Sequence, residues 1–206
     1  MSFARRSAGL LRGFALAALA ATLVGAAPSG AEQVRSFGWL LAEAARAQVS
    51  VTLHYDPGYV RLAYPGGDVP LGRGVCSDGL IRAFRKQGID LQRLVHEDMQ
   101  ANFARYPQNW GLRRPDSSID HRRVLNLQTF FERRGLARPV SRDPDDYWPG
   151  DIVAYLLPGE LPHVGIVGES RAHVHQPPLL IHNIGAGAQI EDVLFAYRIT
   201  GHYRWE

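Results

Sequence analysis

The hydrophobic pattern of this 206-residue chain changes character after about residue 134, and that change restricts the fold most. Apolar residues recur at helical spacing before it, whereas short apolar runs separated by turn signals follow it. We expect helices over 37–48, 75–86, 91–105 and 122–134, and strands over 151–157, 163–168, 179–184 and 193–200. Helices followed by antiparallel strands predict an α+β fold, with the N-terminal helices packed on a small antiparallel sheet.

The first 31 residues are predicted to be a signal peptide. Three arginines within residues 5–12 precede the uncharged run 13–27, which is too short to span a bilayer comfortably. A Ser-Gly-Ala sequence at 29–31 then fits the small-residue pattern of a cleavage site. We therefore expect an exported protein whose mature chain, 32–206, forms one domain and has no membrane association after cleavage.

The composition is that of a globular domain without a nucleic-acid partner. Hydrophobic residues are 46% and charged residues 21% of the chain, and 21 glycines with 13 prolines indicate many turns. The net charge of +3 comes from the predicted signal peptide, because the rest holds 20 basic and 20 acidic residues. Such a domain lacks the excess positive charge that neutralises phosphates.

Cys76 is the only cysteine, so the domain has no internal disulfide. In GVCSDGLIRAF, residues 74–84, it begins a predicted helix after a glycine-rich loop. The unpaired N–H groups and the positive dipole end of a helix favour a thiolate there, and the same N–H groups can hold an oxyanion. Cysteine is also among the residues most often buried without a chemical role, so both interpretations stay open.

A nucleophilic cysteine needs a base, and two histidines lie in predicted strands. His163 begins the strand of LPHVGIVGE, and His182 lies in LLIHNIGAG. Neighbouring antiparallel strands could place the two imidazoles side by side, which would give a nucleophile, a base and an orienting residue. Asn183 points to the other face of a regular strand, but an irregularity near Gly185 would exchange it with His182.

The stretches GVCSDGLIRAF, GDIVAYL, HVGIV and LLIHN together resemble the NlpC-type cell-wall peptidases of the papain-like superfamily. The resemblance implies a papain-like fold with Cys76 as nucleophile, His163 as base and His182 as orienting residue. Tyr64 precedes Cys76 by the distance at which such enzymes place a tyrosine near the oxyanion. Two features differ from the family pattern: Asp78 interrupts the Cys-Ser-Gly motif, and the stretch between nucleophile and base is longer than usual.

A second resemblance covers nearly the whole mature chain. YPGGDVP, GVCSDGLIRAFRKQGIDLQRLVHEDM, IDHRRVLNL, IHNIGAG and GHYRW resemble signature stretches of an exported bacterial family, the domain of unknown function 1287. This resemblance implies a periplasmic or extracellular protein of a bacterium, and it names no substrate.

Three charged residues are candidate substrate-binding groups. Arg122 and Arg123 could hold a substrate carboxylate bidentately, and the stem peptides of the bacterial wall are rich in carboxylates. A solvated basic surface would give the same sequence. Asp78, in the first turn of the Cys76 helix, suits the helix dipole and is the third candidate.

These features predict an exported cysteine hydrolase that cleaves an amide or isopeptide bond in peptidoglycan stem peptides, by a Cys-His-His mechanism without a cofactor or metal. One alternative is a non-hydrolytic acyl transferase or a wall-peptide binding protein on the same scaffold. Another is a metal-binding protein with ligands at His173, His175 and His182, because imidazole is a common zinc ligand. His96 and His121 are reserve bases, and the oligomeric state stays open.

Overall fold

The computed structural model of the chain describes residues 36–172 and 176–206. All of them lie in one compact unit, Val34–Glu206. The predicted signal peptide falls outside the described residues, as do two of the three histidines of the alternative metal site. Among the helices of the described residues, none combines the length and the apolar character that a membrane crossing requires.

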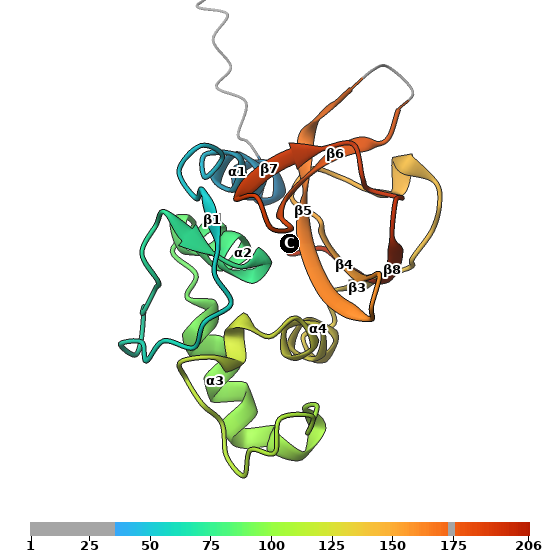
Figure 1. Ribbon diagram of the computed structural model, residues 1–206. Coiled ribbons are helices and arrows are strands. Elements are labelled where there is room, and N and C mark those ends of the chain that lie inside the picture. The colour runs from blue at the N-terminus through green and yellow to red at the C-terminus, as the bar shows by residue number, and fades with distance from the viewer. Residues whose placement is uncertain (1–35, 173–175) are drawn as a thin grey trace, which may run out of the picture. The chain divides into compact units, whose positions relative to one another are not determined.

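The described part of the chain contains four α-helices and a six-stranded sheet (Figure 1). The helices are α1 (Phe37–Arg46), α2 (Cys76–Lys86), α3 (Leu91–Asn102) and α4 (Val124–Arg133), with 3-10 turns at Phe103–Arg105, Asp120–Arg122 and Pro144–Asp146. The strands, in their order across the sheet, are β3 (Ala137–Arg138), β8 (Arg198–Tyr203), β4 (Ile152–Leu157), β5 (Leu161–Arg171), β6 (Pro178–Asn183) and β7 (Ala188–Glu191). All neighbours in this sheet are antiparallel. A separate parallel pair joins β1 (His54–Tyr55) to β2 (Arg73–Gly74).

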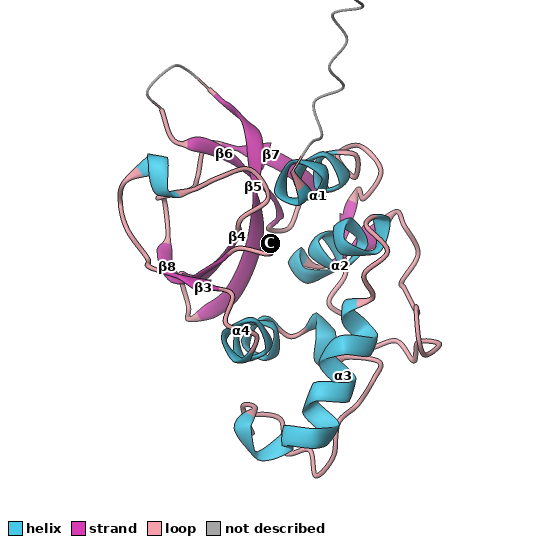
Figure 2. Ribbon diagram, turned by 180° about the vertical axis from the view of Figure 1, so that it is seen from behind, coloured by secondary structure: helices cyan, strands magenta, loops and turns pink. Residues whose placement is uncertain are grey.

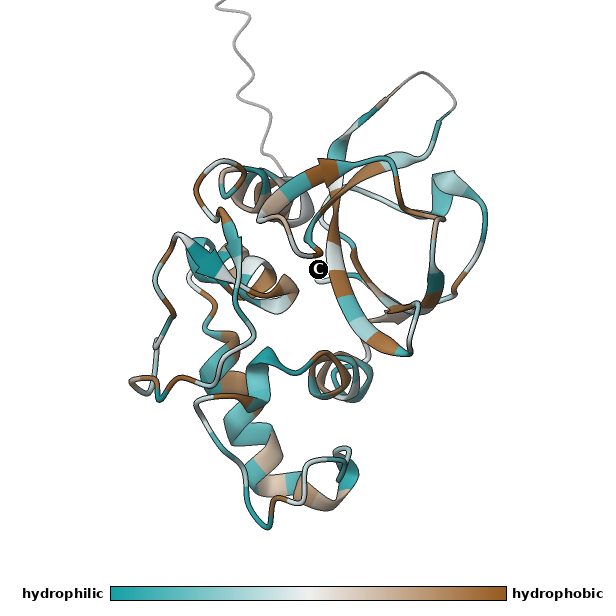
Figure 3. Ribbon diagram, in the orientation of Figure 1, coloured by the Kyte–Doolittle hydropathy of each residue, from teal (hydrophilic) through white to brown (hydrophobic). Residues whose placement is uncertain are grey.

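The helices cover one face of the antiparallel sheet (Figure 2). Helices α1, α2 and α4 contact β5 directly, and α3 packs against α2 and α4. Side chains along the strands alternate between two buried faces. Figure 3 shows apolar residues on both the helices and the strands of the sheet. The helix-facing side chains join the main core with α2: Leu80, Phe84, Ile152, Val164, Ile166 and Ile181. The opposite face builds a second, smaller core: Tyr147, Val153, Tyr155, Val167, Leu180 and Leu194.

Helix α2 begins at Cys76 because the backbone before it is extended. Val75 is extended, with φ −106° and ψ −178°. Its N–H donates to the Asp78 carboxylate at 2.6 Å, which satisfies one of the free donors at the helix start. Gly74 permits this close turn, since a Cβ there would lie 2.8 Å from the same carboxylate. The cysteine is thereby fixed as the first residue of the helix.

The predicted α+β order with an antiparallel sheet is confirmed, and one strand was misplaced. Residues 193–197 form a turn rather than the first part of a strand; the last strands are β7 and β8. The apolar run there resembles a strand because Leu194 is buried in the second core and Val193 and Phe195 pack beside it. Apolar residues of a buried loop thus give the same sequence pattern as those of a buried strand.

Candidate active site

The Cys76 side chain lies where the start of α2 meets the sheet. It is only 7% exposed. Three backbone N–H groups near the sulfur lower its pKa: that of Val164, in β5, and those of Ser77 and Cys76, in the first turn of α2. The helix start therefore supplies the donors that the sequence predicted, and the strand adds a third. Backbone N–H groups converging on one point are also what a developing oxyanion requires.

Burial nevertheless keeps the resting thiol protonated. It raises the pKa of Cys76 from 9.0 to about 11, against the three N–H donors, which lower it. The negative charge of Asp78 raises the pKa further. The expected thiolate at the helix N-terminus is therefore wrong for the resting state. A base has to remove the proton during the reaction.

His163 and His182 are brought together on the sheet face opposite the helices. His163 Nε2 lies 2.9 Å from His182 Nδ1, with the rings in an edge-to-face arrangement. His163 stands directly opposite Tyr155 in the β4–β5 register and is 2% exposed. Burial, and then the neighbouring His182, lower the pKa of His163 to about 3. The ring is thus neutral at pH 7.

Glu191 extends this pair into a chain of three groups. His182 Nε2 lies 2.7 Å from the Glu191 Oε2 atom, and the two residues come from the paired strands β6 and β7. Burial lowers the pKa of His182, and the hydrogen bond to Glu191 partly offsets this. Glu191 could not be identified from the sequence, because its place beside the imidazole depends on the pairing of β7 with β6, and β7 has no clear strand pattern.

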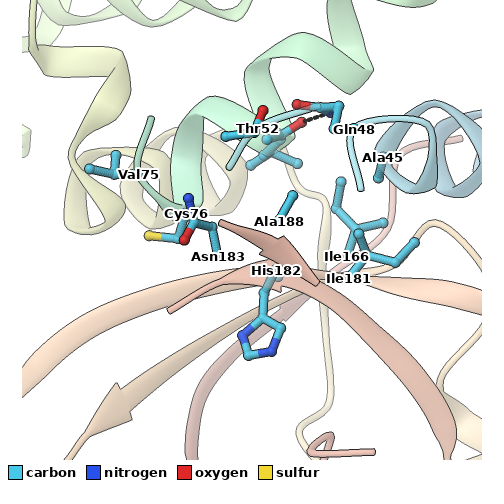
Figure 4. A pocket seen from close by; sticks show the side chains of 13 residues that line it. Ala45, Gln48, Thr52, Val75, Cys76, Ile166, Ile181, His182, Asn183 and Ala188 are labelled. Atoms are coloured by element: carbon cyan, nitrogen blue, oxygen red, sulfur yellow. Dashed lines mark hydrogen bonds between the residues drawn. The ribbon is translucent and has the colours of Figure 1, made fainter. Parts of the chain in front are cut away.

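Asn183 points to the other face of β6, where Cys76 lies. Its side-chain amide donates to the Gly74 carbonyl at 3.1 Å, and its oxygen accepts from the Gly185 N–H. Figure 4 shows Asn183 on the Cys76 side of β6 and the His182 ring on the other side. The sequence left open whether His182 or Asn183 lies beside His163, and the structure places His182 there. His182 is the partner of His163, and Asn183 ties β6 to the loop before the cysteine.

Cys76 and His163 meet at the backbone of β5. The Val164 N–H that donates to the sulfur belongs to the residue after His163. The β5–β6 pairing ends at Ile166 and Ile181, so β6 leaves this stretch of β5 unpaired. Across the described residues, no hydrogen bond joins the thiol to the His163 ring. At rest the thiol and the His163 ring lie on opposite faces of β5.

Two spaces adjoin Cys76. A small enclosed cavity of about 20 Å³ lies on its α1 side and is lined by Ala45, Gln48, Thr52 and Gly79 among others (Figure 4). A more open pocket of about 260 Å³ lies on the other side. Its lining includes Tyr55, Pro57, Trp110, Arg123, Leu125 and Pro162. The larger pocket is the one with room for a peptide side chain.

Tyr64 lies elsewhere, which corrects its expected place near the oxyanion. Its ring packs edge-on against His96 of α3, with centroids 4.9 Å apart, and the charges that act on its hydroxyl lie in α3 or at its N-cap. Tyr55 instead lines the larger pocket together with Cys76, and Cys76 is among the groups that raise its pKa, after burial. Spacing along the sequence could not reveal this, because the intervening loop sets which tyrosine reaches the cysteine.

Asp78 and Arg122 bind each other, and Arg122 also lines the larger pocket, so a contact of either with substrate stays a prediction. The guanidinium donates to both carboxylate oxygens, at 2.8 and 2.9 Å, and the two side chains are at most 4% exposed. Ser77 Oγ also donates to the Arg122 carbonyl, at 2.7 Å. The pair fixes the first turn of α2 against the turn before α4. Asp78 is thereby explained as a structural residue beside the nucleophile.

Arg123 does line the larger pocket. Its guanidinium lies over the Trp110 ring, 4.1 Å from the centroid, and donates to Asp120 at 3.0 Å. The side chain is 18% exposed. Arg122 lines the same pocket, but Arg123 is the more exposed of the two arginines.

The remaining candidates stand apart from Cys76. His96 packs on Tyr64 and bonds to Gln100 in α3, and His121 is buried, which lowers its pKa to about 4. Neither lines the two spaces beside the cysteine. Among the described residues, no three His, Cys, Asp or Glu side chains are arranged to hold a metal ion.

Comparisons with known proteins add a family and two similar proteins. The profile of the family described as Domain of unknown function (DUF1287) matches residues 42–205. The Uncharacterized protein YijF of Escherichia coli (strain K12) is 60% identical over 165 residues, which cover 80% of this chain and 80% of that protein. The solved structure of NlpC1 from Trichomonas vaginalis is similar with a TM-score of 0.45 and 15% identity. That match covers 84% of this chain and 46% of the other, so this chain spans less than half the length of NlpC1.

Proposed function

This chain belongs to the family Domain of unknown function (DUF1287), and we propose that it is an exported cysteine hydrolase. Its substrate class is an amide or isopeptide bond in the peptides of the bacterial cell wall. One observation carries the proposal: a cysteine at a helix start lies beside backbone N–H groups of α2 and of β5 and lines a pocket of about 260 Å³. The residue next to one of those donors begins the chain His163–His182–Glu191.

The chemistry follows from these groups. In this proposal the His163 ring comes within reach of the sulfur when substrate binds, and its Nδ1 takes the thiol proton as the sulfur attacks the carbonyl carbon and the carbonyl electron pair moves to oxygen. The N–H groups at the start of α2, with the Tyr55 hydroxyl, stabilise that oxyanion. His163 then gives its proton to the leaving amine, and the C–N bond breaks to leave a thioester on Cys76. Water, deprotonated by His163, hydrolyses the thioester and restores the thiol.

Three observations support a wall peptide as substrate. Arg123 offers a guanidinium at the pocket, suited to a free carboxylate of the kind that stem peptides carry. The signal-peptide pattern at 1–31 supports export of the chain to the periplasm or beyond. The motifs around Cys76 and His163 resemble those of the NlpC-type wall peptidases.

A wall-peptide binding protein is the second candidate, and one observation favours it. The resting thiol is protonated and has no hydrogen bond to His163 among the described residues. A binding protein on this scaffold would use the larger pocket and Arg123 without a chemical step.

Incubation of purified sacculi with the mature protein distinguishes the two candidates. The hydrolase proposal expects soluble fragments with new amino groups from the wild type and none from Cys76→Ala. Equal pelleting of wild type and Cys76→Ala with the sacculi, with no fragment from either, would support the binding protein.

A further inference from the structure

Three side chains from neighbouring strands form a hydrogen-bonded line at the candidate site. His163 of β5 meets His182 of β6 at 2.9 Å, through Nε2 and Nδ1. His182 of β6 meets Glu191 of β7 at 2.7 Å, through Nε2 and Oε2. His163 and His182 are buried, whereas the Glu191 side chain is 38% exposed. The line thus runs from the protein interior to the solvent edge of the sheet.

The positions of the protons along this line follow from the acceptor at its outer end. A carboxylate only accepts hydrogen bonds, so His182 Nε2 carries a hydrogen towards Glu191. A neutral imidazole has one N–H, which leaves His182 Nδ1 as an acceptor. His163 Nε2 must then donate to it. The lone pair of the neutral His163 ring is left on Nδ1, the nitrogen free to act as a base.

The geometry points to Glu191 as a positioning residue that fixes the tautomers of His182 and His163 and so leaves the His163 lone pair on Nδ1. This assignment rests on the proposed function, in which Nδ1 removes the thiol proton. Glu191 touches neither the thiol nor the larger pocket, whose lining it does not join. It acts only through the two imidazoles.

Without the carboxylate, the same two rings have a second arrangement. His182 Nε2 can then lack its hydrogen and face water, while Nδ1–H donates to His163 Nε2. His163 would carry its hydrogen on Nδ1 and have no lone pair there for the thiol proton. The two arrangements differ only in proton positions, so the heavy atoms and the fold need not change.

The test uses the mature protein labelled with heavy nitrogen, because imidazole nitrogen shifts report the tautomer directly. In the wild type at pH 7, we expect both His163 and His182 to carry hydrogen on Nε2. Glu191→Ala should give a mixture of tautomers at both rings and lower the turnover of wall peptide by about 10²-fold, the lower end for loss of a general base. Asp192→Asn, an exposed neighbour with the same loss of charge, should change neither quantity.

Different results would overturn the positioning role of Glu191 and the proposed hydrolysis by Cys76. Unchanged histidine tautomers in Glu191→Ala would overturn the role of Glu191, whatever the turnover. A shifted tautomer in a protein whose wild type releases no wall fragment would support the role of Glu191 in proton placement and remove the proposed hydrolysis. Circular dichroism and the shifts of the buried His202 show that the variant is folded.

Discussion

The backbone N–H of Val164 donates a hydrogen bond to the sulfur of Cys76, so the nucleophile candidate is held at the residue that follows the base candidate. The contact crosses from the first turn of α2 to the strand β5. This contact also explains why burial has the largest effect on the pKa of the Cys76 thiol. The sulfur lies inside the helix–sheet boundary rather than on an open helix end.

Alkylation of Cys76 should therefore be slow at neutral pH and should accelerate as the pH rises. The pKa of about 11 predicts a rate with iodoacetamide that grows about tenfold per pH unit between pH 7 and 10, since only the thiolate reacts. Cys76 is the only cysteine, so the incorporated mass reports this site alone. A rate that is already constant from pH 6 upward would mean a preformed thiolate–imidazolium pair.

The folded protein should lose stability in acid partly through His163. Its pKa is about 3 in the folded state and 6.5 in an unfolded chain, so below pH 6.5 the unfolded state binds a proton that the folded state does not. The stabilisation is complete above pH 6.5 and is lost as the pH falls towards 3. The fall in the free energy of unfolding between pH 7 and 4.5 should be smaller in His163→Gln. The pKa of His121 is also lowered, so part of the dependence of the free energy of unfolding on pH remains in this variant.

Urea denaturation at the two pH values measures this difference. Parallel slopes in wild type and His163→Gln would show that His163 titrates normally in the folded protein.

The buried pair of Asp78 and Arg122 should stabilise the fold strongly. Asp78→Ala leaves an unpaired buried guanidinium and should lower the free energy of unfolding by about 3–5 kcal/mol. Glu97→Ala removes an exposed partner of Arg93 and should cost less than about 1 kcal/mol. Urea denaturation at pH 7 measures both variants. If the free energy of unfolding fell by a similarly small amount in each, the buried Asp78–Arg122 pair would not be an important stabilising contact.

Substitutions of Tyr55 and Tyr64 test which tyrosine hydroxyl stabilises the oxyanion. Tyr55→Phe should reduce the turnover of wall peptide by roughly 10²–10³-fold, the usual effect of losing one oxyanion donor. Tyr64→Phe should leave turnover unchanged, because this ring packs on His96. The reverse order of effects would restore the position that the sequence spacing suggested for Tyr64.

Local patterns in the sequence located most of the helices and the strands β4, β5 and β6. Leu80 and Phe84 recur at helical spacing because one face of α2 packs on the sheet. The same patterns located Cys76 at a helix start and two histidines in adjacent strands. All of these depend on residues close together in the chain.

The features that the sequence did not reveal depend on distant contacts. Glu191 becomes visible only when β7 is paired with β6. Arg122 and Asp78 are 44 residues apart, so a basic residue beside a helix start looked available for substrate. The pKa of Cys76 required burial against β5, which opposes the helix-end effect that the sequence suggested.

The central claim is that Cys76 hydrolyses an amide bond in wall peptides with His163 as its base. It is tested most directly by digesting purified wall peptides in water enriched in heavy oxygen and measuring the product masses by mass spectrometry. The account predicts that the wild type releases paired fragments, one with a new amine and one with a new carboxyl that carries one heavy oxygen atom. Cys76→Ala and His163→Ala should each release almost none while remaining folded. Wild-type fragments without the heavy label, or equal release by Cys76→Ala, would contradict it.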